Sequence, residues 1–424
     1  MRSKYLKNRQ NFLIFCLFCI LIFFINSAIS YYKYQIFMDN GEQELTARVI
    51  SSYQKMGSDG KKRQILKLQT DDFTFYTMGS KSDDFRAGDS IFLSVIKLYV
   101  SVKDYLASTF YMPSFSREKL PQKPAHSFNQ KLQSLIYAQH ENSKIAQLYS
   151  ALFLGTNIDG ELRDDVSNWG VAHLIAISGY HLGVISAVCF FLLKLFFKPI
   201  YARYMPYRSY IFDFTIAVFL VLCFYFYMIG FIASFLRAFL MSVIGFYMIC
   251  KKIKILNFYT LFGVILFSIA LFPQLLFSIG FYFSCLGVFY IFVYLFYFAP
   301  KFSLLANSLL LNLYVFFAME VAVLYFFPLI SLLQLSVLAL NYLFGVFYPL
   351  SFLLHLFGYG GIFDEILSKM LAFRLAQGSL HISTFIFLLY NTCALLSLKF
   401  KAVSLLPPLF GMSAFLLYIL KIFI

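Results

Sequence analysis

Residues 210–229 read YIFDFTIAVFLVLCFYFYMI, a stretch in which Asp213 is the only charged side chain. A helix needs roughly 20 apolar residues to cross the hydrocarbon of a bilayer. Because lipid offers a backbone amide no hydrogen-bond partner, such a stretch has to be helical there. The sequence therefore predicts a polytopic α-helical membrane protein with about ten spans, plus interfacial amphipathic helices. The other apolar segments are 11–30, 171–197, 231–250, 255–272, 275–299, 304–328, 330–357, 376–398 and 402–424.

The composition excludes two other classes of protein. Of the 424 residues, 60% are hydrophobic and 13% are charged, whereas soluble domains are nearer half apolar and a quarter charged. A soluble globular protein and a disordered chain are both excluded. The 35 Lys and Arg against 20 Asp and Glu indicate basic cytoplasmic loops and contact with anionic lipid, and only secondly a polyanionic substrate. The seven Cys lie in or beside apolar runs, so we expect no disulfide framework and no metal site.

The first thirty residues predict a membrane anchor. Residues 1–10 carry four basic side chains and no acidic one, and an apolar run follows. We interpret 1–30 as a retained transmembrane anchor with its N-terminus in the cytoplasm. A signal peptide cleaved near Ser27 and Ala28 is the alternative.

Residues 31–120 have a different character, because charged side chains occur every few positions. Apolar residues alternate with polar ones in several short runs, for example at Leu45, Ala47 and Val49, which indicates short β-strands. We expect a small external all-β domain of the OB type. Residues 121–170 are predicted to be a linker and amphipathic helices that lie along the bilayer surface, or that pack on the β domain. Residues 171–424 form the polytopic domain.

Basic and aromatic side chains in the β domain are candidates for DNA contact, since single strands bind cationic grooves with aromatic platforms. Residues 31–130 hold 14 basic against 11 acidic groups, so an ordinary solvated surface is an equally simple interpretation. The candidates are Lys61, Lys62, Arg63, Phe73, Phe75, Arg86 and Lys97.

Residues 170–183, GVAHLIAISGYHLG, place polar side chains at the start of an apolar segment. We expect these side chains to line or shape a hydrated path: His173, Ser178, Tyr180 and His181. The GxxxG spacing of Gly179 and Gly183 favours close helix packing. The two His are eight residues apart, about 12 Å along a helix, and cannot share a metal ion. Ser178 and His181 are three apart and able to touch, so an intramembrane serine protease stays open as an alternative.

Two more charges lie at probable membrane depth, Arg237 and Glu320. A charge in a span is costly and faces a partner or a wet cavity. The two residues therefore either form an ion pair with each other or line a lumen. The planar guanidinium of Arg237 suits contact with phosphate.

The strings that carry the polar residues resemble those of the ComEC family of competence channels. The first match is Ala151-Leu-Phe-Leu-Gly155, followed by Leu162-Arg163 and His173-Leu-Ile-Ala-Ile-Ser178-Gly-Tyr-His181-Leu-Gly183. The second is Leu236-Arg237-Ala238-Phe-Leu-Met241, and the third runs from Phe272-Pro273 to Gly280-Phe281-Tyr282-Phe-Ser284, where Tyr282 replaces a usual Gln and Gly280 is expected to serve helix packing. The metallo-β-lactamase-like domain of many relatives is not expected here, because no His-x-His-x-Asp-His string occurs.

The resemblance implies an inner-membrane channel that carries single-stranded DNA into the cytoplasm during natural transformation. It implies no enzymatic activity and no cofactor. The expected partners are single-stranded DNA, membrane lipid, an external DNA receptor, a separate nuclease, and a cytoplasmic translocase or single-strand-binding proteins. A small-solute or lipid transporter remains a second interpretation of the same polar residues.

Overall fold

The computed structural model describes residues 2–39, 41–56, 62–70, 73–79, 85, 89–97, 100–107, 110–120, 128–229, 233–250 and 258–423. These residues fall into two compact units. The first unit comprises Met1–Phe128 and Gly263–Ser278, and the second comprises Asn129–Phe262 and Ile279–Ile424.

The first unit begins with α1 (Arg2–Met38), which continues eight residues beyond the predicted end of the anchor at residue 30. The reason is packing: Tyr34, Phe37 and Met38 contact the core of the β domain, so the last turns of the helix have a protein surface to cover. Within the apolar part of α1, the Asn26 amide donates to the carbonyl of Ala270 at 2.7 Å.

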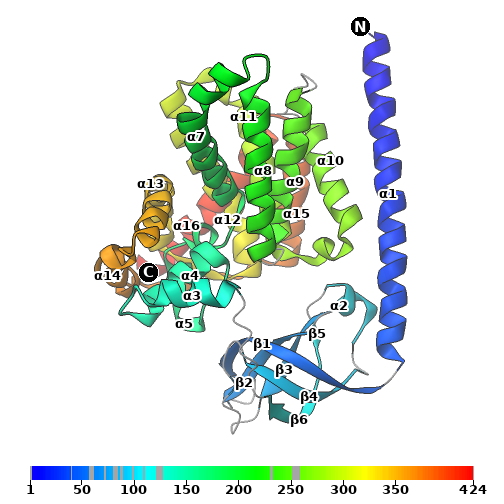
Figure 1. Ribbon diagram of the computed structural model, residues 1–424, viewed down its shortest axis with the longest axis vertical. Coiled ribbons are helices and arrows are strands. Elements are labelled where there is room, and N and C mark those ends of the chain that lie inside the picture. The colour runs from blue at the N-terminus through cyan, green and yellow to red at the C-terminus, as the bar shows by residue number, and fades with distance from the viewer. Residues whose placement is uncertain are drawn as a thin grey trace. The chain divides into compact units, whose positions relative to one another are not determined.

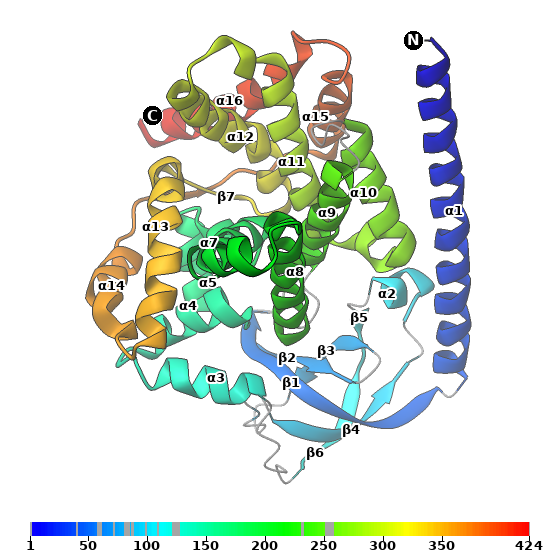
Figure 2. The ribbon, with the colours of Figure 1, turned by 45° about the horizontal axis from the view of Figure 1, so that its top comes forward.

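In the β domain, one continuous segment of chain provides both edge strands of the sheet. Strand β1 (Glu42–Met56) pairs antiparallel with both β2 (Lys62–Gln69) and β4 (Ser90–Ile96), and β2 pairs with β3 (Thr74–Gly79). The helix α2 (Val102–Leu106) precedes β5 (Phe110–Tyr111) and β6 (Ser114–Lys119). Of these last two strands, β5 lies parallel to β3 and β6 antiparallel to β4 (Figure 2).

Because only two residues separate β5 from β6, the chain joins the two edges of the sheet, as in an OB-like barrel. The period-2 pattern of the sequence accounts for the core, since alternate side chains of a strand share a face. Leu66, Leu68, Phe75, Ile91 and Leu93 are completely buried. The prediction of a small all-β domain is confirmed.

The second unit is almost entirely helical (Figure 1). Its first elements are α3 (Phe128–Tyr137), α4 (Ser143–Leu154), α5 (Gly160–Asn168), α6 (Ala172–Ile175), α7 (Gly179–Tyr204), α8 (Tyr210–Ile229), α9 (Ala233–Cys250) and α10 (Phe258–Leu271). The last part of α10 and the following η1 (Pro273–Phe277) belong to the first unit. Then follow α11 (Ile279–Tyr297), η2 (Ala299–Lys301), α12 (Leu304–Phe326), β7 (Leu329–Ser331), η3 (Leu332–Ser336), α13 (Val337–Leu356), η4 (Gly360–Phe363), α14 (Asp364–Ala372), β8 (Gln377–Ser379), α15 (Thr384–Leu396), η5 (Val403–Leu405) and α16 (Leu406–Phe423).

Seven helices in the described residues are long and apolar enough to cross a membrane, and three more apolar helices are shorter. The chain is therefore a multi-pass membrane protein. The seven are Phe12–Met38, Gly179–Tyr204, Tyr210–Ile229, Ile279–Lys301, Leu304–Phe326, Leu332–Leu356 and Val403–Lys421, and the shorter ones are Phe235–Met248, Phe258–Leu271 and Thr384–Leu396.

One predicted span is shortened by extended backbone. Residues 376–398 were expected to be apolar helix throughout, but α15 begins only at Thr384, because β8 pairs antiparallel with β7. The amide of Leu380 also donates to the carbonyl of Pro328 at 3.1 Å. These bonds satisfy backbone groups that a helix would otherwise satisfy within itself.

The helix α4 is enclosed by other helices of the second unit, and its predicted place on the bilayer surface or against the β domain stays a prediction. Eight of its twelve residues are buried. It contributes Ile145, Tyr149 and Leu152 to a core shared with Val337 and Phe344 of α13 and with Leu371 of α14, and Figures 1 and 2 both draw these helices side by side. The apolar residues of α4 therefore pack on protein around most of the helix.

Candidate functional site

A cavity of about 530 Å³ in the second unit brings together polar side chains from otherwise apolar elements. The elements are α6, the start of α7, and the facing sides of α11, α12 and α13. The lining residues are His173, Leu174, Ser178, Tyr180, His181, Ile291, Ser308, Leu311, Asn312, Val315, Asn341, Tyr342 and Gly345.

A chain of hydrogen bonds crosses the cavity wall from α6 to α12. The Nε2 of His173 lies 3.2 Å from Oδ1 of Asn341, whose amide donates to Oδ1 of Asn312 at 2.8 Å. The amide of Asn312 donates in turn to the carbonyl of Leu338 at 2.7 Å. The Nδ1 of His173 lies 3.1 Å from the carbonyl of Gly170. Both ring nitrogens therefore face an oxygen, and a neutral imidazole donates to only one of the two.

Ser178 and His181 do touch, but as the N-terminal cap of α7. The Ser178 hydroxyl accepts from the amide of Tyr180 at 3.3 Å, and Nδ1 of His181 accepts from the amide of Ser178 at 3.2 Å. This reciprocal arrangement is a capping box. Because Nδ1 accepts a backbone proton, it is not free to act as a base toward the Ser178 hydroxyl, which lies 3.3 Å away. The cap accounts for the contact between Ser178 and His181, and the protease alternative stays a prediction.

His181 itself is fully buried and is one of the residues that line the cavity. Its ring meets those of Phe344 and Tyr348 edge to face, with centroids 5.7 and 4.7 Å away. The Nε2 has no hydrogen-bond partner among the described residues.

Arg237 lies beside the start of α7, next to the cavity and not in its wall. Its Nε donates to the Ser284 hydroxyl of α11 at 2.8 Å, and its side chain is almost completely buried. A Cβ at Gly179 would lie 3.1 Å from that of Ala238 and 3.6 Å from Nη2 of Arg237. Gly179 therefore permits α9 to approach α7, as the sequence predicts for a packing glycine.

Glu320 does not join this group, and it forms no ion pair with Arg237 in the described part of the chain. The cavity face of α12 carries Ser308, Asn312 and Val315. At 100° per residue, the five positions from Val315 to Glu320 place the two side chains on different faces of α12. It is buried where α12 packs on α16, and its Cβ lies 3.0 Å from where a Cβ of Gly411 would be. Among the described residues Glu320 therefore has no ion pair with Arg237 and does not line this cavity, and its role in a lumen stays a prediction.

The structure gives different results for Tyr180, predicted to line the path, and for Gly183 and Gly280, predicted to pack helices. Tyr180 points its hydroxyl at Gly345 of α13, where a Cβ would lie 2.9 Å from it. A Cβ at Gly183 would meet nothing within 4 Å, and Gly280 is exposed. Among the described residues, Gly183 therefore has no close helix neighbour, and the packing role of Gly280 stays a prediction.

Two of the seven β-domain candidates are removed from the surface. Phe75 is completely buried and Lys97 nearly so. The Lys97 ammonium donates to the carbonyl of Phe37 at 2.6 Å and lies 4.5 Å from the centre of its ring. Burial also lowers the pKa of Lys97. Neither side chain is placed to contact DNA, because alternation turns both toward the core.

The other β-domain candidates are half-buried or have side chains outside the described part of the structure. Phe73 is half-buried in an aromatic cluster with Phe37 and Phe110, at 5.0 and 5.6 Å between centroids. Lys62 and Arg63 lie in β2, but their side chains are outside the described part of the structure, as are the whole residues Lys61 and Arg86.

Four cavity residues were missed by the sequence reasoning: Ser308, Asn312, Asn341 and Tyr342. A signal for the first pair does exist, since Ser308 and Asn312 are four apart in an apolar run and so share a helix face. Nothing local connects them to His173.

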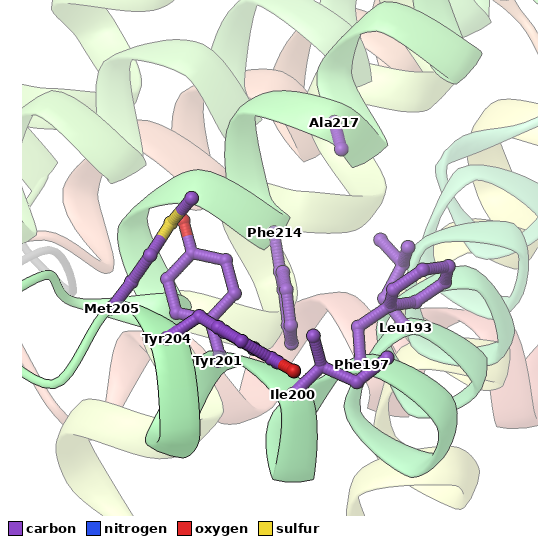
Figure 3. A pocket seen from close by; sticks show the side chains of 8 residues that line it. All are labelled: Leu193, Phe197, Ile200, Tyr201, Tyr204, Met205, Phe214 and Ala217. Atoms are coloured by element: carbon purple, nitrogen blue, oxygen red, sulfur yellow. The ribbon is translucent and has the colours of Figure 1, made fainter.

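A second hollow, of about 320 Å³, lies between α7 and α8 and is lined almost entirely by apolar groups (Figure 3). Phe197, Tyr201 and Tyr204 of α7 face Phe214 and Ala217 of α8 there. It contains none of the predicted site residues.

Comparison with known proteins places the cavity in a family context. The family model of the competence protein matches residues 152–424, which include every residue that lines the cavity. No curated protein and no solved structure matches the chain. The match covers more than half of the chain and confirms the resemblance to ComEC. The chain therefore belongs to the competence protein family, whose role is the uptake of DNA.

Proposed function

We propose that this protein forms a channel in the inner membrane that conducts single-stranded DNA into the cytoplasm. The observation that carries the proposal is the polar cavity, built from the family-matched helices α6, α7, α12 and α13. Amides, hydroxyls and imidazoles in an apolar bundle need water or a polar guest, since burying them in hydrocarbon is costly.

The chemistry of the cavity wall suits passage better than tight binding. No Lys or Arg lines it in the described residues, whereas each additional phosphate contact would strengthen binding and slow release. Tyr180 and Tyr342 offer aromatic faces on which any base stacks. Such contacts do not depend on base sequence, as DNA uptake requires.

The basic N-terminal residues favour a cytoplasmic N-terminus and therefore an external β domain. We propose that conduction requires no catalysis by this chain, because the Ser178–His181 pair is engaged as a helix cap. An external receptor, a nuclease and a cytoplasmic translocase or single-strand-binding protein would then supply capture, strand separation and pulling.

Asn341→Leu tests the role of the cavity, because leucine has a similar volume and removes the hydrogen bonds to His173 and Asn312. Asn391→Leu is the matched control, since Asn391 accepts from Tyr282 at 2.8 Å outside the cavity. Both variants are expressed in a deletion strain, and labelled DNA that reaches the cytoplasm is measured against the amount of protein in the membrane. We expect Asn341→Leu to reduce uptake by at least about tenfold, because the loss of even one of these two hydrogen bonds, at about 1.4 kcal/mol, corresponds to that factor.

Equal uptake in Asn341→Leu and wild type, at equal protein level, would refute the role of the cavity. A small-solute or lipid transporter is the second candidate, because a cavity of this volume also suits a small ligand. Loss of solute flux on deletion, with DNA uptake intact, would favour it.

A further inference from the structure

Three titratable side chains meet outside the cavity, at the far end of α13. His140 follows α3, His355 is in the last turn of α13, and Asp364 begins α14. The Nδ1 of His140 lies 2.9 Å from Oδ1 of Asp364, and its Nε2 lies 3.0 Å from Nε2 of His355. The Nδ1 of His355 lies 2.7 Å from the carbonyl of Ser351.

The number of protons in this chain of contacts follows from its chemistry. A backbone carbonyl and a carboxylate only accept, so both Nδ1 contacts need a proton, and the Nε2 contact needs a third. Two neutral imidazoles and an ionised carboxylate supply two protons. Without the third, two nitrogen lone pairs would face each other at 3.0 Å. The three contacts need three protons in total, whichever of Asp364, His140 and His355 carries the additional one.

Burial disfavours a positive charge on the imidazole pair, and two neighbours, Asp364 and Tyr149, offset that cost. The His140 side chain is fully buried, and that of Asp364 is 20% exposed. The ring of Tyr149 stacks on His140, with centroids 4.8 Å apart and planes inclined by 8°, which favours a cation on the ring face. Of the charged and titratable groups on the elements around the pair, Asp364 and Tyr149 face it.

Of the other charged groups on these elements, Glu141 follows His140 directly and is exposed to solvent, and the next ones are paired elsewhere. Lys369 bonds Glu365 of the same helix at 2.6 Å, and Lys144 bonds Glu161 at 2.8 Å. Tyr348 lies against His181 near the cavity, two turns before His355.

We propose that Asp364, His140 and His355 form a latch that binds one shared proton and thereby fastens the α3–α4 connection to the end of α13. Loss of the proton leaves two opposed lone pairs, and the contact opens. The same helix carries Asn341, Tyr342 and Gly345 at its cavity end, so the latch determines how firmly that helix is held. This inference does not depend on what passes through the cavity.

Hydrogen–deuterium exchange on the full-length protein in nanodiscs tests the latch. Peptides that cover 138–146 and 351–366 are followed from about pH 5 to about pH 9, the range in which imidazoles titrate, after correction for intrinsic exchange. We expect protection to be lost as the pH rises, in these peptides and not in the helix cores. Protection that does not change with pH in the wild type would overturn the proposal.

Two variants and a control distinguish a shared proton from simple packing. In His355→Gln the amide donates to Nε2 of His140 without an additional proton, so protection should persist and no longer depend on pH. In Asp364→Asn the negative charge is lost, so the transition should move to lower pH. His381→Gln replaces an exposed histidine and should behave as wild type. A pH dependence retained in His355→Gln, or protection that a chelator removes at constant pH, would refute the shared proton.

Discussion

Replacing Gly411 with alanine should destabilise the pair of helices α12 and α16. The two helices cross closely, and their contact includes Leu324, Ala414 and Phe415, which are all buried. A Cβ on Gly411 would overlap the carbonyl oxygen of Phe317 and lie 2.8 Å from its carbonyl carbon. Backbone atoms have no other rotamer to adopt, so the helices themselves have to move.

The magnitude follows from contact distances. Carbon atoms attract best at about 3.5–4.0 Å, and the carbonyl oxygen is nearer still than the carbonyl carbon, so α16 must shift by more than about 1 Å. Helices in lipid associate through van der Waals packing and not through the hydrophobic effect, and forced overpacking costs about 1–3 kcal/mol. Alanine gains up to about 1 kcal/mol over glycine in helix propensity. The clash should therefore outweigh the gain.

Thermal unfolding in detergent micelles, followed by circular dichroism, measures the effect. Gly183→Ala is the matched control, because it adds the same methyl group to α7 with nothing within 4 Å and should be neutral or slightly stabilising. We expect Gly411→Ala to melt below the wild type and Gly183→Ala at or above it. If Gly411→Ala melted no lower than Gly183→Ala, the close crossing of α12 and α16 would be wrong.

Three further predictions concern other parts of the molecule. Because burial lowers the pKa of Lys97, the unfolded chain holds more protons between that lowered value and the usual value of about 10.4. The stability of the β domain should therefore rise with pH in that window, and pH-dependent unfolding of Lys97→Met should not show the rise. Asp165→Asn removes the buried carboxylate that pairs with Arg374 and, beside Glu161, with Lys144, and should lower the unfolding free energy by about 2 kcal/mol, the scale of a hydrogen bond to a charged group. Glu161→Gln on the exposed side of the same helix should lower it by less than about 1 kcal/mol, and equal effects in denaturant titrations would contradict this difference. Gly345→Ala should displace the Tyr180 hydroxyl into the cavity and reduce DNA uptake with little loss of stability; unchanged uptake would count against that placement.

The arrangement of polar residues was predictable only in part. The string from His173 to His181 stands out because imidazoles and a hydroxyl are unexpected in an apolar run, and the structure places all of its predicted polar residues in the cavity wall. Asn341 is 168 positions from His173, and no periodicity reaches so far. Its partnership depends on how α13 packs against α6, which is a property of the whole bundle.

The sequence by itself determined the class of protein, the membrane helices and the β domain, because bilayer thickness and strand alternation act on neighbouring residues alone. Tertiary structure decided which side chains meet. It turned Lys97 into the core, gave Arg237 a serine in place of an acid, separated Glu320 from the cavity, and set His140 against His355. The physical reason is that the free energy of a polar group depends on the atoms within a few ångströms, and distant segments supply those atoms.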